Sequence, residues 1–230
     1  MISVIIPTLN SEIALAQSLS ALVTAAAEGV VREVIVVDGG SADNTHMVAD
    51  AAGCEWLVQS GPRSKRLALG ANQARRGDWL LFLSADTVLD TGWHHEVQAF
   101  IERAERAGSA DRTAAAFKLR LEAFGLAPRV SETFASLRSH ILGMPYGNQG
   151  LLLSRRFYND LGGYRPLPEL EDLDLVKRIG RRRLVFLRAA AISSGRPEGH
   201  GLMTSLRRTV ARFCVGALRL PPSLVVKLHG

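Results

Sequence analysis

The sequence predicts one α/β domain in which helices flank a mixed, mostly parallel central sheet. Two short runs rich in β-branched residues, 2–6 and 34–37, each end in a turn of Pro, Thr, Asn, Asp, Gly or Ser, and a helix-like pattern follows each turn. The chain has 230 residues, of which 47% are apolar and 22% charged, so it can bury one sizeable core. In a parallel sheet built from such units, the polar loops gather at the carboxyl ends of the strands.

Strands and helices alternate along the chain. Asn10 or Ser11 is placed to cap a first helix whose apolar residues recur at helical spacing. The run at 34–37 is almost entirely apolar, as expected of a strand that is covered on both faces. The expected elements are, in order, strand 2–6, a helix that reaches 26, strand 34–37, helix 43–52, strand 55–59, helix 64–76, strand 79–83, helix 92–107, strand 113–121, helix 128–142, strand 150–153, helix 155–161, helix 170–179 and strand 184–187.

The chain is basic, with 28 Lys and Arg against 22 Asp and Glu, a formal charge of +6 and a pI near 9.9. This charge favours anionic partners, and nucleotide phosphates, nucleic acid and an anionic membrane surface all suit it. An Arg-rich composition also follows from genomic base bias, so the charge does not choose between these partners.

The chain has features of a protein of the cytoplasm. Its two cysteines, Cys54 and Cys214, lie far apart without metal-binding spacing, which predicts neither a disulfide framework nor a zinc site. The N-terminus enters a strand directly, without the pattern of a signal peptide, and no window reaches about 18 uninterrupted apolar residues. We therefore expect a cytoplasmic protein, which docks on the inner face of the membrane if its C-terminal segment binds lipid.

Asp38 ends the second apolar run and is followed by Gly39, Gly40 and Ser41. A carboxylate at this position either satisfies backbone N–H groups at the entry to the next helix or accepts hydrogen bonds from a base or ribose. The glycines would let a ligand approach the backbone closely. This turn alone leaves both interpretations open.

Asp86 follows the apolar strand 79–83 in the sequence Ser84-Ala85-Asp86-Thr87. A carboxylate at this position can coordinate a hard divalent cation that bridges diphosphate oxygens, or it can cap a turn. A basic stretch upstream suits contact with phosphate oxygens, although a solvated helix face has the same composition. Its members are Arg63, Lys65, Arg66 and Asn72.

Four carboxylates fall within six residues at the start of helix 170–179: Glu169, Glu171, Asp172 and Asp174. The helix dipole stabilises acidic residues in a first turn, but four carboxylates are more than this stabilisation accounts for. One of the four is therefore a candidate general base toward a hydroxyl nucleophile.

Residues 201–230 contain basic but no acidic side chains, and their apolar residues recur at helical spacing. They predict a basic amphipathic helix that either packs on the domain or binds anionic lipid. We expect a main domain over 1–200, with a nucleotide-binding part at about 1–90 and an acceptor part at about 91–200, followed by this extension.

Four motifs, taken in order, resemble the family 2 glycosyltransferases: residues 4–10, 36–45, 81–87 and 171–175. The resemblance implies the nucleotide-sugar-binding fold called GT-A. It also implies inverting transfer of a sugar from a nucleoside-diphosphate sugar, with uridine the first nucleoside to test. The acceptor would be the hydroxyl of a small or lipid-linked molecule, and no nucleic acid partner is expected.

The same resemblance implies roles for single residues. Asp86 matches the last carboxylate of the family's DxD motif, which binds the metal and the sugar diphosphate. Asp172 matches the general base, with Glu171 and Asp174 beside it on the acceptor side. The expected donor-binding residues are Pro7, Thr8, Asn10, Asp38, Gly39, Ser41, Arg63, Arg66, Asn72, Ser84, Ala85 and Asp86.

The chain departs from the motif at Ser84, where the family has the first DxD carboxylate, and a single carboxylate holds a metal less firmly. In some enzymes of this fold a late histidine joins the metal. His200, between Gly199 and Gly201, is the candidate here, with a plain loop histidine as the alternative. We expect a divalent cation, Mn²⁺ or Mg²⁺, as the cofactor.

Two other functions stay open. A nucleotidyltransferase shares the general sheet, but it normally begins with a glycine-rich phosphate loop that carries Lys or Arg, which residues 7–10 lack. A non-catalytic module that binds a nucleotide sugar or a partner would explain Ser84. The presence of Asp38, Asp86 and Asp172 together argues against such a module.

Overall fold

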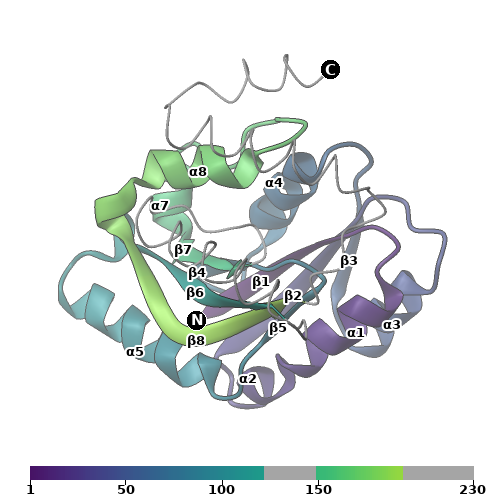
Figure 1. Ribbon diagram of the computed structural model, residues 1–230, viewed down its shortest axis with the longest axis horizontal. Coiled ribbons are helices and arrows are strands. Elements are labelled where there is room, and N and C mark those ends of the chain that lie inside the picture. The colour runs from purple at the N-terminus through teal and green to yellow at the C-terminus, as the bar shows by residue number, and fades with distance from the viewer. Residues whose placement is uncertain (122–148, 194–230) are drawn as a thin grey trace.

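Four parallel strands form one half of the central sheet in the computed structural model, which describes residues 1–121 and 149–193 (Figure 1). Strand β1 (Ile2–Thr8) pairs in parallel with β2 (Val31–Asp38) and with β4 (Trp79–Phe82), and β2 pairs with β3 (Glu55–Val58). All residues of β1 and β4 are buried, as expected of central strands with both faces covered. The carboxyl ends of these four strands therefore lie at one edge of the sheet.

The other half of the sheet is mixed. Strand β7 (Leu151–Ser154) runs antiparallel to both β4 and β6 (Ala114–Leu121), while β8 (Leu184–Ser193) is parallel to β6. A short strand, β5 (Thr87–Leu89), pairs antiparallel with the end of β8. The strand order is β3-β2-β1-β4-β7-β6-β8-β5, which confirms the predicted mixed, mostly parallel sheet.

Helices cover both faces of this sheet (Figure 1). Because side chains alternate along β1, Val4 and Ile6 pack into one apolar cluster and Ile5 into the other. One face carries α1 (Glu12–Ser20), α2 (Val23–Ala27), α3 (Thr45–Ala51) and α5 (Trp93–Arg106), and the other carries α4 (Arg63–Gln73), α7 (Arg155–Asp160) and α8 (Glu171–Ile179). Two short 3₁₀ turns, η1 (Ala110–Arg112) and η3 (Arg181–Arg183), precede β6 and β8.

The sequence prediction differs most from the structure at three elements. The helix expected to reach residue 26 is divided into α1 and α2, because the chain turns where the N–H of Leu22 donates to the carbonyl of Leu19. Strand β5 was not expected, since three residues are too few to show a period. Strand β8 continues past the expected end at 187 to Ser193, because it pairs there with both β6 and β5.

Two expected helices, 128–142 and the one in 201–230, lie outside the described residues. Over residues 1–121 and 149–193, no helix is long and apolar enough to cross a membrane.

Candidate active site

The turns that follow β1 and β2 are joined to each other by hydrogen bonds. The backbone N–H of Asn10 donates to Oγ of Ser41 at 2.7 Å, and Oδ1 of Asn10 accepts from the N–H of Ala42 at 2.8 Å. Asn10 has a φ of 49°, in the left-handed region that Asn adopts more readily than most residues. The two turns that the sequence singled out thus form one loop pair at the carboxyl edge.

Asp38 is 2% exposed, and its carboxylate accepts four hydrogen bonds from the protein. Oδ1 accepts from the hydroxyls of Thr8 and Ser41, at 3.0 and 2.5 Å, and Oδ2 from the N–H groups of Gly40 and Ser41, at 2.7 and 2.6 Å. Burial by itself would raise the pKa of Asp38, but these hydrogen bonds outweigh it and hold the pKa below its usual value. A carboxylate has about four acceptor sites, and these four hydrogen bonds account for them. Asp38 therefore organises the turn in this structure. Its direct contact with a nucleoside stays a prediction.

Arg66, on α4, lies against the same turn. The side chain is 9% exposed, and its Nη1 donates to the carbonyl of Gly61 at 2.9 Å. A Cβ on Gly39 would lie 2.6 Å from that Nη1, so the guanidinium occupies space that only a glycine leaves open. A buried guanidinium therefore lies beside the Asp38 turn, where the sequence predicts a phosphate contact.

Arg63, the first residue of α4, lies between two carboxylates of α8. Its Nη1 is 2.7 Å from Oε1 of Glu171 and 2.7 Å from Oδ2 of Asp172. The hydroxyl of Tyr164 donates to Oδ1 of Asp172 at 3.0 Å. We call these four side chains the Arg63 cluster. It joins the N-termini of α4 and α8, and α4 begins at the carboxyl edge because it follows β3.

Burial and mutual charge shift the pKa values of Glu171, Arg63 and Tyr164 in the Arg63 cluster. Burial, and then the charge on Asp172, raise the pKa of Glu171, while Arg63 opposes both effects. Burial by itself would lower the pKa of Arg63, but the charges of Asp172 and Glu171 raise it, so the guanidinium stays cationic. Burial raises the pKa of Tyr164 well above its usual value, which keeps the phenol a neutral donor. The side chain of Asp172 is 23% exposed against 8% for Glu171, so Asp172 is the more accessible of the two carboxylates.

Tyr164 is a site residue that the sequence analysis missed, because it belongs to no motif. Its ring packs edge-on against Phe82 of β4 with 5.0 Å between centroids, and its N–H donates to the hydroxyl of Tyr158 at 2.9 Å. Gly163, with a φ of 61°, allows this approach, since a Cβ there would lie 2.9 Å from the same hydroxyl. The only sequence signal was an aromatic residue eight positions before Asp172.

Asp86 lies at the same edge, in the turn after β4. Its Oδ2 accepts from Oγ of Ser193, at the end of β8, at 3.1 Å, and the turn closes through the N–H of Thr87 and the carbonyl of Ser84. Carboxylate and hydroxyl oxygens are hard donors, and Mg²⁺ is usually held by one or two carboxylates together with substrate phosphates. Asp86 therefore fits such a cation. Ala85, between Ser84 and Asp86 in the sequence, is buried. His200 lies outside the described residues.

The structure does not bring every predicted residue to this group. Asn72 is exposed near the C-terminal end of α4, about nine residues and roughly 13 Å along the axis from Arg63. Asp174 is 7% exposed and forms ion pairs with Arg178 at 2.6 Å and with Arg165 at 3.6 Å, a structural arrangement within and beside α8. Pro7 is buried in β1, one residue before the loop pair, in register with Val37.

A sheet of this order, covered by helices on both faces and with polar loops at its carboxyl edge, is the GT-A fold of nucleotide-sugar transferases. The family model of "Glycosyl transferase family 2" matches residues 3–148, more than half of the chain. The chain belongs to this family and is a glycosyltransferase, as the sequence predicts. The match ends before α8, so the assignments on α8 depend on the geometry of the Arg63 cluster.

Solved structures share the fold at low sequence identity. Glucosyl-3-phosphoglycerate synthase from Mycobacterium tuberculosis, in complex with Mn²⁺ and uridine-diphosphate-glucose, has a TM-score of 0.63 and 20% identity over 93% of this chain and 78% of its own. TarS from S. aureus has a TM-score of 0.65 and 20% identity over 97% of this chain, which spans 41% of TarS. A comparison with curated protein sequences gave no match.

Proposed function

We propose that the chain transfers a sugar from a uridine-diphosphate sugar to an acceptor hydroxyl, with inversion at the anomeric carbon and with Asp172 as the general base. The Arg63 cluster carries this proposal. It holds one partly exposed carboxylate, Asp172, in a fixed orientation beside a buried one, Glu171, at the carboxyl edge of the sheet. The fold shared with the mycobacterial synthase, solved with uridine-diphosphate-glucose, supports the choice of donor.

Inverting transfer needs a base on the face of the sugar opposite the leaving diphosphate. The acceptor oxygen bonds to the anomeric carbon as the bond from that carbon to the diphosphate oxygen breaks, and the hydroxyl proton passes to Asp172. Arg63 and Tyr164 each engage one oxygen of the Asp172 carboxylate. Each oxygen keeps a second lone pair, so the carboxylate is held in orientation and can still accept a proton.

The donor would lie over the loop pair after β1 and β2. Arg66 supplies a buried cation beside the Asp38 turn, which suits the bidentate recognition of phosphate oxygens. Asp38 acts there chiefly by holding the turn, because its carboxylate is engaged by Thr8, Gly40 and Ser41.

Asp86 is the residue that would hold Mn²⁺ or Mg²⁺, with Ser84 as a neighbouring oxygen donor. When bound, such a cation offsets the negative charge that develops on the departing diphosphate. The mycobacterial synthase was solved with Mn²⁺, which supports a divalent cation on this fold.

The variant Asp172→Asn tests the assignment of the base. We expect its affinity for uridine diphosphate, measured by calorimetry with Mn²⁺, to stay within about twofold, while transfer falls by about 10² or more, the scale of general-base removal. Asp160→Asn removes an exposed carboxylate of α7 and is the matched control. Normal transfer by Asp172→Asn would place the base elsewhere. Binding without transfer of any donor sugar by the unaltered chain would favour the non-catalytic module.

A further inference from the structure

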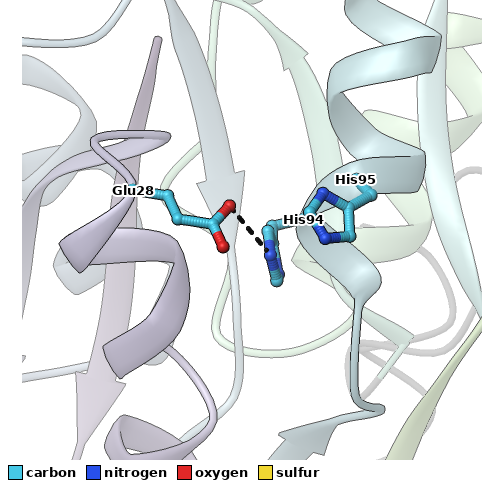
Figure 2. Close-up of side chains that lie close together, drawn as sticks. All are labelled: Glu28, His94 and His95. Atoms are coloured by element: carbon cyan, nitrogen blue, oxygen red, sulfur yellow. Dashed lines mark ion pairs between the residues drawn. The ribbon is translucent and has the colours of Figure 1, made fainter.

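A second group of titratable side chains lies on the opposite face of the sheet from the Arg63 cluster. It consists of Glu28 at the end of α2 and of His94 and His95 in the first turn of α5. Each offers a ligand atom, and these atoms all lie within 4.8 Å of one another. Figure 2 shows the carboxylate of Glu28 reaching across from its helix toward the His94 ring, with His95 on the adjoining position.

Glu28 and His94 lie at ion-pair distance, which makes an ion pair when the imidazole is protonated, but the contact lacks hydrogen-bond geometry (Figure 2). Oε2 of Glu28 lies 3.2 Å from Nε2 of His94. His94 is only 4% exposed, and its Nε2 forms no hydrogen bond with any described residue. The Glu28 carboxylate, at ion-pair distance, is therefore the group that this buried nitrogen faces, whereas buried polar atoms are normally hydrogen-bonded.

The spacing suits a shared metal ion. Zn²⁺ binds imidazole nitrogen and carboxylate oxygen at about 2.0–2.2 Å, which places two tetrahedral ligand atoms about 3.3 Å apart. The Glu28–His94 separation of 3.2 Å already has this value. Glu28 and His95 are exposed, so rotation of their side chains can bring the third ligand atom to the same point.

The site is preorganised by the packing around it. Nε1 of Trp93, the residue before His94, donates to the carbonyl of Ala21 at 3.0 Å, which docks the start of α5 on the junction between α1 and α2. Trp93 is itself 1% exposed. The two helices that carry the ligands are therefore held together before any ion binds, so binding has to order only the exposed side chains of Glu28 and His95.

We propose that Glu28, His94 and His95 form a binding site for one Zn²⁺ ion or a similar borderline divalent cation, with water as the fourth ligand. Two imidazoles and one carboxylate are a ligand set that zinc proteins use, whereas Mg²⁺ prefers oxygen ligands throughout. This site is separate from the position of Asp86. It would tie the end of α2 to the start of α5 and stabilise that face of the domain.

The test uses the full-length protein without affinity-tag histidines, stripped with a chelator and dialysed. We expect calorimetry to find Zn²⁺ binding and the melting temperature to rise with Zn²⁺, because an ion that binds only the folded state stabilises it. The double variant Glu28→Gln/His95→Ala changes two exposed side chains and should weaken this binding by more than the roughly 10–100-fold that loss of a ligand's supporting partner costs. Nitrogen-15 shifts of the His94 and His95 rings should move on addition of Zn²⁺.

Two controls separate this site from others. Glu102→Gln removes an exposed carboxylate of α5 and should keep the affinity for Zn²⁺. Asp86→Asn should also keep it, which distinguishes this site from a cation held in the candidate active site. The proposal is overturned if the folded wild-type protein does not bind Zn²⁺, or if Glu28→Gln/His95→Ala binds it with wild-type affinity.

Discussion

Nη1 of Arg63 and Oδ2 of Asp172 lie 2.7 Å apart, although 109 residues separate them in the sequence. The same Nη1 lies 2.7 Å from Oε1 of Glu171, so one cation serves two adjacent carboxylates. Arg63 was predicted to contact a diphosphate. In the structure it holds the acidic pair of α8, and its contact with phosphate stays a prediction.

Removing the charge of Arg63 should make Glu171 harder to ionise. In Arg63→Met the pKa of Glu171, which burial and Asp172 already raise, loses the cation that opposes them and should rise further. Because Glu171 lies beside Asp172 and shares the cation of Arg63 with it, the acid limb of the pH–rate profile for transfer should move to higher pH. The profile, together with carboxyl carbon-13 shifts of Glu171, measures this.

Arg63→Lys is the matched control, since it keeps the charge but offers a point cation in place of a planar fork. Its acid limb should move less than that of Arg63→Met. Identical pH profiles for Arg63→Met and the wild type would contradict a role for Arg63 in holding Glu171 ionised.

Asp38 should make folding stability depend on acidic pH. Its folded pKa is lowered, so the stability that its ionised form contributes is present above the unfolded value of about 3.9 and is lost as pH falls through the folded pKa. Asp38→Asn leaves buried donors without a charged acceptor and should cost about 2 kcal/mol at pH 7. Urea denaturation at pH 7 and near pH 3 measures the difference, which should shrink at the lower pH. An equal difference at both pH values would show that ionisation of Asp38 does not stabilise the turn.

Asp86 should link donor affinity to the divalent cation. With Mn²⁺ present, Asp86→Asn should bind uridine diphosphate about tenfold or more weakly than the wild type, because the carboxylate that would hold the ion is gone. After treatment with a chelator, the two proteins should bind it alike. Asp50→Asn, an exposed carboxylate on α3, is the control. Calorimetry that finds the same Mn²⁺ effect in Asp86→Asn as in the wild type would rule Asp86 out as the ligand.

The fold was largely predictable because its signals are local. The β-branched runs of β1 and β2 and the turns after them depend on residues within a few positions, and both strands include the predicted runs, although β2 begins three residues earlier, at Val31. Strand β5 was not predictable, since its pairing with β8 joins residues that are more than 100 positions apart, such as Thr87 and Ser193.

The candidate site was predictable only in part. The sequence placed Asp38, Asp86 and Asp172 after their strands or at a helix start, and the order of the strands puts those positions at one edge. The partners of their carboxylate oxygens had no signal in the sequence. Tyr164 was missed for that reason. Asn72 was included because its residue type suits phosphate contact, but the sequence does not show that α4 carries it away from the carboxyl edge of the sheet.

The sequence by itself determined the α/β class, the loops at the carboxyl edge and the residue types available for chemistry, because these follow from short-range patterns of polarity and turn chemistry. The tertiary structure alone decided which charges meet. In the tertiary structure, Arg63 forms ion pairs with Glu171 and Asp172, and the acceptor sites of Asp38 are occupied by donors that include its own turn. The same packing places Glu28 beside His94. Such pairings depend on how distant elements pack across the sheet, and hydrogen bonds and ion pairs form only over a few ångströms.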